Sequence, residues 1–306
     1  MVRERQLGPI VPRPVSHDPE GTEPLVASAA ADYRRRLKQV RSVYIELLES
    51  IPREEVTVNK RYTYRLWPDL LGTVDAVVDN ILLEGGVDHP WLWESYVEAA
   101  YMRGTARAVR NLARQSAAYR SSRTTVRDVL QSPAYARRTL MIRARVFEEM
   151  KGLGGQVKAD MGRLLTDGVA RGKSPLDIAR NLTEQLGIEE YRAERIARTE
   201  VNTALRRARW DETEDAQEAF GLASKEMHLS ALSPTTRAEH AARHGKLYTL
   251  EESRDWFAEG SNSINCKCST VTVLIGKGGD PLAPAVVKSA AEARNRYEAK
   301  QTEANR

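Results

Sequence analysis

Residues 172–188 read GKSPLDIARNLTEQLGI, a segment with a well-marked helix start. Ser174 can cap the helix, Pro175 suits its first turn, and Asp177 lies three residues after the cap, where it can bond back. Apolar residues then recur on one side, and Gly187 predicts the end of this helix. The segment is therefore expected to be helical, and it indicates the fold class of the chain around it.

The sequence on both sides of this segment also favours helices. Hydrophobic residues make up 41% of the 306 residues and aromatic residues only 6%, while Ala, Arg, Glu and Leu occur in runs. These four side chains lose little rotamer freedom in a helix. Apolar spacing and terminal signals predict further helices over residues 37–48, 70–83, 91–118, 134–150, 157–165 and 189–219.

Residues 225–275 have a different character. They are rich in His, Ser, Thr and Gly, and they end in STVTVLI, a β-branched run that is typical of a strand. We therefore predict a mainly α fold with a small α+β module, in which a helical amino-terminal region is followed by a domain that ends in a β-strand. The expected domains are a Pro-rich extended arm (1–24), a helical region with an Arg-rich stripe (25–150), the α+β domain (151–275) and a flexible or helical tail (276–306).

The boundary near residue 150 follows from three closely spaced glycines. Gly152, Gly154 and Gly155 come after a long helical pattern, and glycine favours a helix end or a loosened helix. No segment is apolar or long enough for a signal peptide or a membrane span, so we expect the chain to reside in a cytoplasm.

Cys266 and Cys268 are the only cysteines of the chain and stand one residue apart in the stretch SINCKCST. Two cysteines are too few for a disulfide framework. A disulfide within Cys-Lys-Cys would be strained, and a redox motif normally has two residues between its thiols. The pair therefore predicts thiols, either bound to a metal or buried.

Two histidines add to this pair. His240 and His244 are four residues apart, so both rings leave the same face if the segment is helical. Together with Cys266 and Cys268 they offer two imidazoles and two thiolates, which suits a tetrahedral structural zinc ion. The single residue between the cysteines is a tighter spacing than usual. The alternative is a metal-free cluster of hydrogen-bonded histidines and buried thiols.

Arginine is concentrated between residues 103 and 145. This window holds eleven arginines, no lysine and one acidic residue, in a chain of net charge +5. Helical spacing places several of these arginines in one stripe, which repels itself unless it faces phosphate or an acidic partner. We expect contact with DNA, without base reading, or with an acidic protein ring; the alternative is a solvated face. The stripe consists of Arg103, Arg107, Arg110, Arg114, Arg120, Arg123 and Arg127.

Motifs of DNA-binding regulators and of enzymes are weak or missing in this sequence. Residues 172–188 resemble the first part of a helix-turn-helix, but a plain αα-hairpin has the same cap and spacing. The chain has no Gly-x-x-x-x-Gly-Lys phosphate loop and no Gly-x-Ser-x-Gly elbow. Glu239 stands beside His240 without the His-Glu-x-x-His spacing of zinc hydrolases. We therefore predict that the protein is not an enzyme.

Several of these motifs follow one another in a known order. The run RAERIARTE at residues 192–200 comes after GKSPLDIAR and before TTRAEH, which ends at His240, then Gly245 and INCKC, which ends at Cys268. This combination resembles the phage Mu F-like family of minor head proteins over roughly residues 150–275. The family's Trp and Asp before its Thr-Arg are replaced here by Met227-His228 and Ser233-Pro234. The motif residues that the resemblance carries over are Arg198, Thr199, Glu200, Arg237, His240, Cys266 and Cys268.

The resemblance implies a component of a tailed-bacteriophage virion that associates with the portal vertex during head assembly. The expected partners are the portal protein, capsid or scaffold subunits, and double-stranded DNA without sequence specificity, in packaging or ejection. The chain would then lie in the capsid interior or at the portal vertex, after a stage in the host cytoplasm. Two alternatives from other classes are a helix-turn-helix DNA-binding regulator and a zinc-dependent nuclease or toxin.

Overall fold

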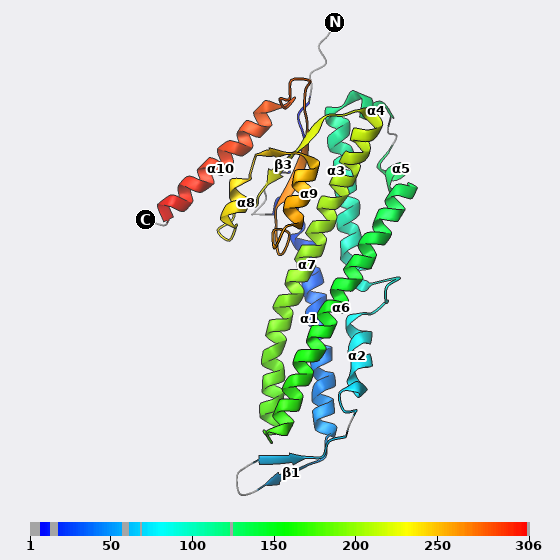
Figure 1. Cartoon of the computed structure of the whole chain (residues 1–306), viewed down its shortest axis with the longest axis vertical. Coiled ribbons are helices and arrows are strands. Elements are labelled where there is room, and N and C mark those ends of the chain that lie inside the picture. Colours follow the sequence, from blue (N-terminus) through cyan, green and yellow to red (C-terminus); the bar gives the residue numbers. More distant parts are fainter. Residues whose placement is uncertain (1–6, 13–17, 57–60, 68, 123–124, 305–306) are drawn as a thin grey trace. The chain divides into compact units, whose positions relative to one another are not determined.

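The computed structural model describes residues 7–12, 18–56, 61–67, 69–122 and 125–304 (Figure 1). It is mainly α with small antiparallel sheets, which confirms the predicted fold class. The helices are α1 (Glu23–Ser50), α2 (Gly72–Leu82), the π-helix η1 (Trp93–Val97), α3 (Glu98–Gln115), α4 (Ala117–Ser122), α5 (Val126–Leu130), α6 (Pro133–Ala170), α7 (Pro175–Phe220), α8 (Ala238–Ala242), α9 (Leu250–Ala258) and α10 (Pro284–Ala304). The strands are β1 (Arg53–Val56), β2 (Arg61–Tyr64), β3 (Ser224–Leu229), β4 (Leu247–Tyr248) and β5 (Ser269–Leu274).

The chain forms two compact units that alternate along the sequence. One unit contains residues 1–25, 97–139 and 198–306, and the other contains residues 26–96 and 140–197. Helices α6 and α7 each contribute residues to both units. The domain limits expected from composition, at residues 24, 150 and 275, stay predictions. Within the described ranges, no helix has both the length and the apolar content that crossing a bilayer requires.

The unit of residues 26–96 and 140–197 is a helical bundle built from α1, α2 and parts of α6 and α7 (Figure 1). Each helix buries one apolar face, as Leu37 and Tyr44 do on α1. Gly168 lets α6 approach α7 closely, because a Cβ at this position would lie 2.6 Å from Cγ1 of Ile178. Strands β1 and β2 form an antiparallel hairpin beside the turn between α6 and α7, where Tyr62 N donates to Gly172 O (3.0 Å).

The helix start predicted at residue 174 is confirmed, but the predicted end at Gly187 is wrong. Ser174 Oγ accepts a hydrogen bond from Asp177 N (3.2 Å), and α7 begins at Pro175. The helix then continues for 46 residues without a turn. A helix-turn-helix needs a turn after its first helix, so residues 172–188 form one side of an αα-hairpin instead.

Helix α6 likewise continues through Gly152, Gly154 and Gly155, where a helix end or a loosened helix was expected. A glycine inside a helix costs about 1 kcal/mol relative to alanine. This cost is offset because α6 buries apolar residues at helical spacing before, between and after the glycines: Val146, Met150, Leu153, Val157 and Met161. Packing of the apolar face therefore decides the length of α6.

The other unit contains a three-stranded antiparallel sheet in the order β4-β3-β5. The strand predicted from STVTVLI is present as β5, with Met227 of β3 opposite Val271. One face of the sheet is apolar, and α10 and Val11 of the amino-terminal arm pack against it. The residues of this apolar cluster are Val11, Met227, Leu229, Leu247, Val271, Val273, Val286, Val287 and Ala290.

The opposite face of this sheet is polar and yet buried. It carries Glu226 and His228 on β3 and Thr270 and Thr272 on β5, all at most 3% exposed. Helix α7 reaches this face, because Trp210 Nε1 donates to Thr270 Oγ1 (2.9 Å). A fully buried polar face is uncommon and needs internal partners. It lies beside the cysteines and histidines singled out from the sequence.

Candidate functional site

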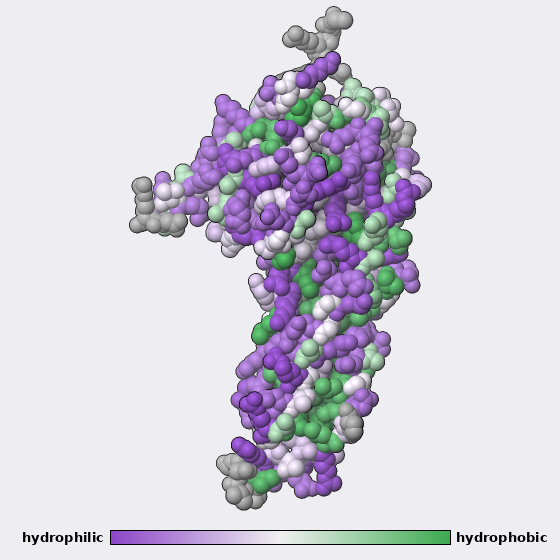
Figure 2. All heavy atoms as spheres, viewed as in Figure 1, coloured by the Kyte–Doolittle hydropathy of each residue, from purple (hydrophilic) through white to green (hydrophobic). Residues whose placement is uncertain are grey.

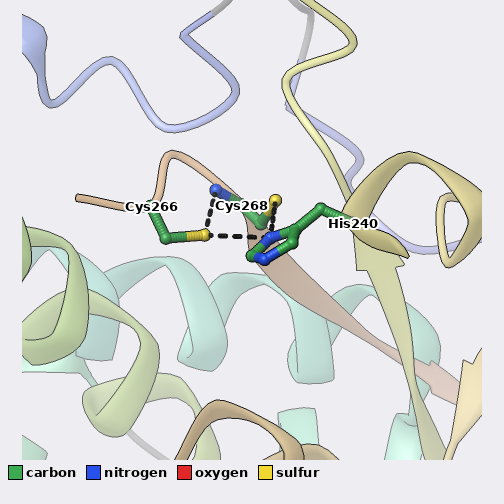
Figure 3. A group of neighbouring side chains, drawn as sticks. All are labelled: His240, Cys266 and Cys268. Carbon is green, nitrogen blue, oxygen red and sulfur yellow. Dashed lines mark hydrogen bonds between the residues drawn. The ribbon is translucent and has the colours of Figure 1, made fainter. Parts of the chain in front are cut away.

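His240, Cys266 and Cys268 converge on one point (Figure 3). His240 comes from α8, and the cysteines lie just before β5. The Nδ1 atom of His240 is 3.4 Å from Cys268 Sγ and 3.5 Å from Cys266 Sγ. All three residues are buried, with exposed fractions of 2–4%. Three of the four ligands predicted from sequence are therefore brought together, and we call them the His-Cys-Cys cluster.

His244, the fourth predicted ligand, does not belong to this group. Its Nδ1 accepts a hydrogen bond from Ser230 N (3.0 Å), and burial lowers the pKa of its imidazole. Helix α8 ends at Ala242, so the helical face on which the spacing argument depends does not extend to residue 244. His244 instead fixes the chain after β3.

Helix α7 holds the backbone of the cysteine loop. Asn202 Nδ2 donates to Cys266 O (2.9 Å), and Arg206 Nη1 donates to Cys268 O (2.9 Å). Thr199 Oγ1 accepts from the backbone N of Asn265 (3.0 Å). Asn265 has a left-handed φ of 52°, which asparagine adopts more readily than most residues. These bonds use backbone atoms of the loop and leave both thiols to face His240.

The other motif residues support the same region. The Arg237 guanidinium donates to Ser261 O (2.8 Å) and Asn262 O (3.2 Å), so the residue before α8 is tied to the segment that leads to the cysteines. Arg198 forms an ion pair with Glu23, which also lies 3.3 Å from Lys267 Nζ. Glu200 is 2% exposed. The IARTE motif, residues 196–200, thus supports the Cys-Lys-Cys loop.

Asn202 and Arg206 were not found by sequence reasoning, although a signal was present. Polar residues recur at positions 199, 202, 206 and 209, which places them along one face of α7. Such a polar stripe inside a helix that should bury that face indicates internal hydrogen bonding. Arg206 is only 1% exposed, and its guanidinium lies 4.3 Å from the centre of the Phe257 ring.

The two thiols differ in their electrostatic environment. Hydrogen bonding with Cys268 and with His240, together with the Arg206 charge, lowers the pKa of Cys266 to about 4 against the opposing effect of burial. The side-chain hydrogen bond with Cys266 and burial both raise the pKa of Cys268. The thiol of Cys266 is thus the first of the pair to give up its proton. A thiolate is the form that binds metals.

Further polar atoms are buried around the cluster. The His228 and His240 rings both pack edge-on to Trp256, with ring centres 5.0 and 4.7 Å away. The Nε2 atom of each ring accepts or donates no hydrogen bond within the described part of the chain. Burial also lowers the pKa of His228 well below its usual value and raises that of Glu226. The site is therefore a buried polar region of the core, packed against aromatic rings.

The predicted basic stripe divides into two groups. Arg103 Nη1 donates to Gly21 O (2.7 Å), and Arg107 forms an ion pair with the buried Glu20. Glu20 also accepts from Arg209 Nη2 (2.8 Å), so these arginines hold the amino-terminal arm. Arg123 lies outside the described residues. The remaining members, on α3 to α5, are exposed: Arg110, Arg114, Arg120 and Arg127.

Comparison with known proteins identifies the central segment. Residues 159–271 match the family model described as Phage Mu protein F like protein. The match runs from α6 to β5 and includes the IARTE motif, His240 and both cysteines. The chain thus contains a domain of the phage Mu protein F-like family, as the sequence motifs indicated.

A curated relative is similar to part of the chain. NAD(+)--arginine ADP-ribosyltransferase EFV of Enterococcus faecalis is 31% identical over 119 residues, which cover 36% of this chain and 24% of that protein. The present chain therefore spans only 24% of the length of the relative. No solved structure matches.

Proposed function

We propose that this chain is a minor head protein of a tailed bacteriophage that acts in head morphogenesis at the portal vertex. The observation that carries the proposal is the match of residues 159–271 to the phage Mu protein F-like family. A domain of this family supports a role in phage head morphogenesis. The role is one of binding, and no reaction is assigned to the chain. The similarity to the ADP-ribosyltransferase covers 24% of that protein and carries none of its activity to this chain.

The proposed protein partners are the portal protein and capsid or scaffold subunits. Exposed apolar side chains on the unit of residues 26–96 and 140–197 support a protein partner, since large apolar residues at the surface often mark binding sites. Figure 2 shows hydrophobic side chains at the surface over α2 and α6. Exposed apolar residues of this unit include Leu140 (56%), Met141 (74%), Leu176 (69%), Ile188 (50%) and Tyr191 (61%).

The proposed contact with double-stranded DNA is limited to the exposed half of the basic stripe. Arg110, Arg114, Arg120 and Arg127 are exposed. Guanidinium groups at a surface bind phosphate through charge and paired donors, without reading bases. Arg103 and Arg107 contribute less, because they already bind residues 20 and 21. The expected binding is therefore salt-sensitive and independent of sequence.

The test is the composition of virions. Mass spectrometry of purified particles from the source phage should detect this chain in both procapsids and mature virions, at a small fraction of the major capsid protein. A portal protein carrying an affinity tag should retain the chain after procapsids are disrupted. Particles with a normal portal and no trace of this chain would overturn the proposal.

A further inference from the structure

The His-Cys-Cys cluster has the geometry of a metal site. In a tetrahedral zinc site the Zn–S distance is about 2.3 Å and the Zn–N distance about 2.0–2.1 Å, so a nitrogen and a sulfur ligand lie about 3.6 Å apart. The Nδ1 atom of His240 lies 3.4 and 3.5 Å from the two sulfurs. Two edges of the coordination tetrahedron are therefore already formed. We propose that His240, Cys266 and Cys268 bind one zinc ion.

The donor set selects the kind of metal. Two thiolates and one imidazole are soft or borderline ligands, which suit zinc and disfavour Mg²⁺ and Ca²⁺, whose ligands are oxygens. Carboxylates are absent from the group of ligand atoms found among the described residues. The proposed zinc ion thus has different ligands from an ion such as Mg²⁺ that is held by carboxylates or phosphates. Its binding does not depend on any contact between the basic stripe and DNA.

The surrounding fold orients the ligands before a metal arrives. Asn202, Arg206 and Thr199 hold the loop through its backbone, so the direction of both thiols is fixed without using the sulfur atoms. Cys268 N donates to Cys266 Sγ (3.3 Å), a bond that stabilises a thiolate ligand. Preorganised ligands lose less conformational entropy on binding, which increases metal affinity.

His240 completes the site with the correct nitrogen. Coordination through Nδ1 places the proton of the neutral ring on Nε2, which is buried and makes no hydrogen bond to a described residue. Glu239 Oε1 lies 4.0 Å from this Nε2. A carboxylate near the second ring nitrogen is a common support of metal-bound histidine. The metal would link α8 to the start of β5 and so fasten the cysteine loop to the sheet.

The fourth position is assigned to a small non-protein ligand such as water. His244, which the sequence predicted for it, uses Nδ1 to accept from Ser230 N. This assignment makes a sharp distinction between the two histidines. Replacement of His240 should abolish metal binding, whereas replacement of His244 should leave it intact.

The experiment uses the full, untagged chain with Asn substitutions at each histidine. Asparagine at position 244 can still accept from Ser230 N, so His244→Asn is the matched control for His240→Asn. Elemental analysis should find about one zinc per chain in the wild type and in His244→Asn. The zinc content should fall at least tenfold in His240→Asn, Cys266→Ser and Cys268→Ser, each checked for folding by circular dichroism.

Cobalt exchange in the wild type provides a test that requires no variant to fold. Co²⁺ should give thiolate-to-metal charge-transfer absorption and the visible bands of tetrahedral coordination, and zinc should displace both. X-ray absorption at the zinc edge should show two sulfur ligands and two nitrogen or oxygen ligands. The proposal would be overturned by a folded wild-type chain that takes up no zinc or cobalt and whose thiols react equally fast with and without added zinc.

Discussion

Arginine has opposite roles in two regions of the same compact unit. Arg206 and Arg209 of α7 are buried, and each donates to backbone carbonyl groups of the segment that leads into or forms β5. Arg110 and Arg114 of α3 carry the same charge at the surface. A buried guanidinium must satisfy its donors inside the protein, whereas an exposed one can also donate to water or to a partner. The surroundings of each arginine, rather than the number of arginines, therefore decide which ones are accessible for the proposed contact with DNA.

Substitution of a buried arginine should give the largest effect. Arg209→Met removes the Nη2 partner of Glu20 (2.8 Å) and leaves Arg107 as the ion-pair partner of this carboxylate among the described residues. Removal of one member of a buried ion pair costs about 3–5 kcal/mol, because the other charge stays buried. Urea unfolding, followed by tryptophan fluorescence and circular dichroism, should show this loss in the free energy of unfolding.

A double-mutant cycle separates the ion pair from simple packing. If the buried charge causes the loss, adding Glu20→Gln to Arg209→Met should recover part of it, since a neutral side chain costs less to bury. Glu20→Gln alone should also destabilise the protein. Additive effects of the two substitutions, or an Arg209→Met variant within about 0.5 kcal/mol of the wild type, would contradict the assigned role.

The two groups of arginines also show how much of the structure could be predicted from the sequence alone. The stripe from Arg103 to Arg127 was visible because helical spacing is a local property. Its division into structural and exposed members was not visible, because Glu20 reaches Arg107 across 87 residues of sequence. The absence of acids within the stripe indicated an external partner for all its members, whereas the amino-terminal arm supplies the partner for two of them.

The sequence predicted the chemistry of the candidate site, but it did not predict correctly which residues form the site. Cys266 and Cys268 were found from their rarity, and His240 from its residue type and order along the chain. His244 was included because its spacing from His240 suits one face of a helix, whereas α8 ends at Ala242. Helix ends depend on tertiary packing, as the glycines inside α6 and α7 also show. The hydrogen bonds of Asn202 and Arg206 cross more than 60 residues of sequence, which spacing rules do not cover.

Neutralising the exposed arginines should weaken DNA binding without unfolding the protein. The test variant carries Arg→Gln at positions 110, 114, 120 and 127, since glutamine keeps a good helix propensity. Its affinity for random double-stranded DNA should fall on the order of tenfold or more at low salt, and the slope of log K against log salt should become shallower by about 0.9 for each lost phosphate contact. Fluorescence anisotropy over a salt series measures both.

A matched control variant removes the same charge elsewhere. Arg65, Arg163, Arg171 and Arg180 are also exposed, and each is paired with a carboxylate. Their replacement by glutamine should leave the salt slope within error of the wild type. Equal loss of affinity in both quadruple variants would mean that net charge alone attracts DNA, and that the stripe is no defined site.

The smallest effect is expected for an arginine between the two extremes. Arg192 is about one-third exposed and donates to Asp160 Oδ2 (2.7 Å). Hydrogen bonds from Arg192, Gln156 and Arg163 lower the pKa of Asp160 to about 2, from an ordinary value of 3.8. Because the pKa is depressed in the folded state, the ionised carboxylate stabilises the fold above about pH 4, and this contribution is lost as the pH falls towards 2.

The variant Asp160→Asn should therefore cost about 1 kcal/mol at pH 7, and its difference from the wild type should shrink as the pH falls from 4 to 2. Urea unfolding at pH 7 and pH 3 measures this trend. Asp167→Asn is the control, because its partner Arg171 is 69% exposed, and such surface pairs contribute about 0–1 kcal/mol. A difference for Asp160→Asn that stays constant with pH would mean that the lost hydrogen-bond geometry, and not the charge of the carboxylate, is what Arg192 recognises.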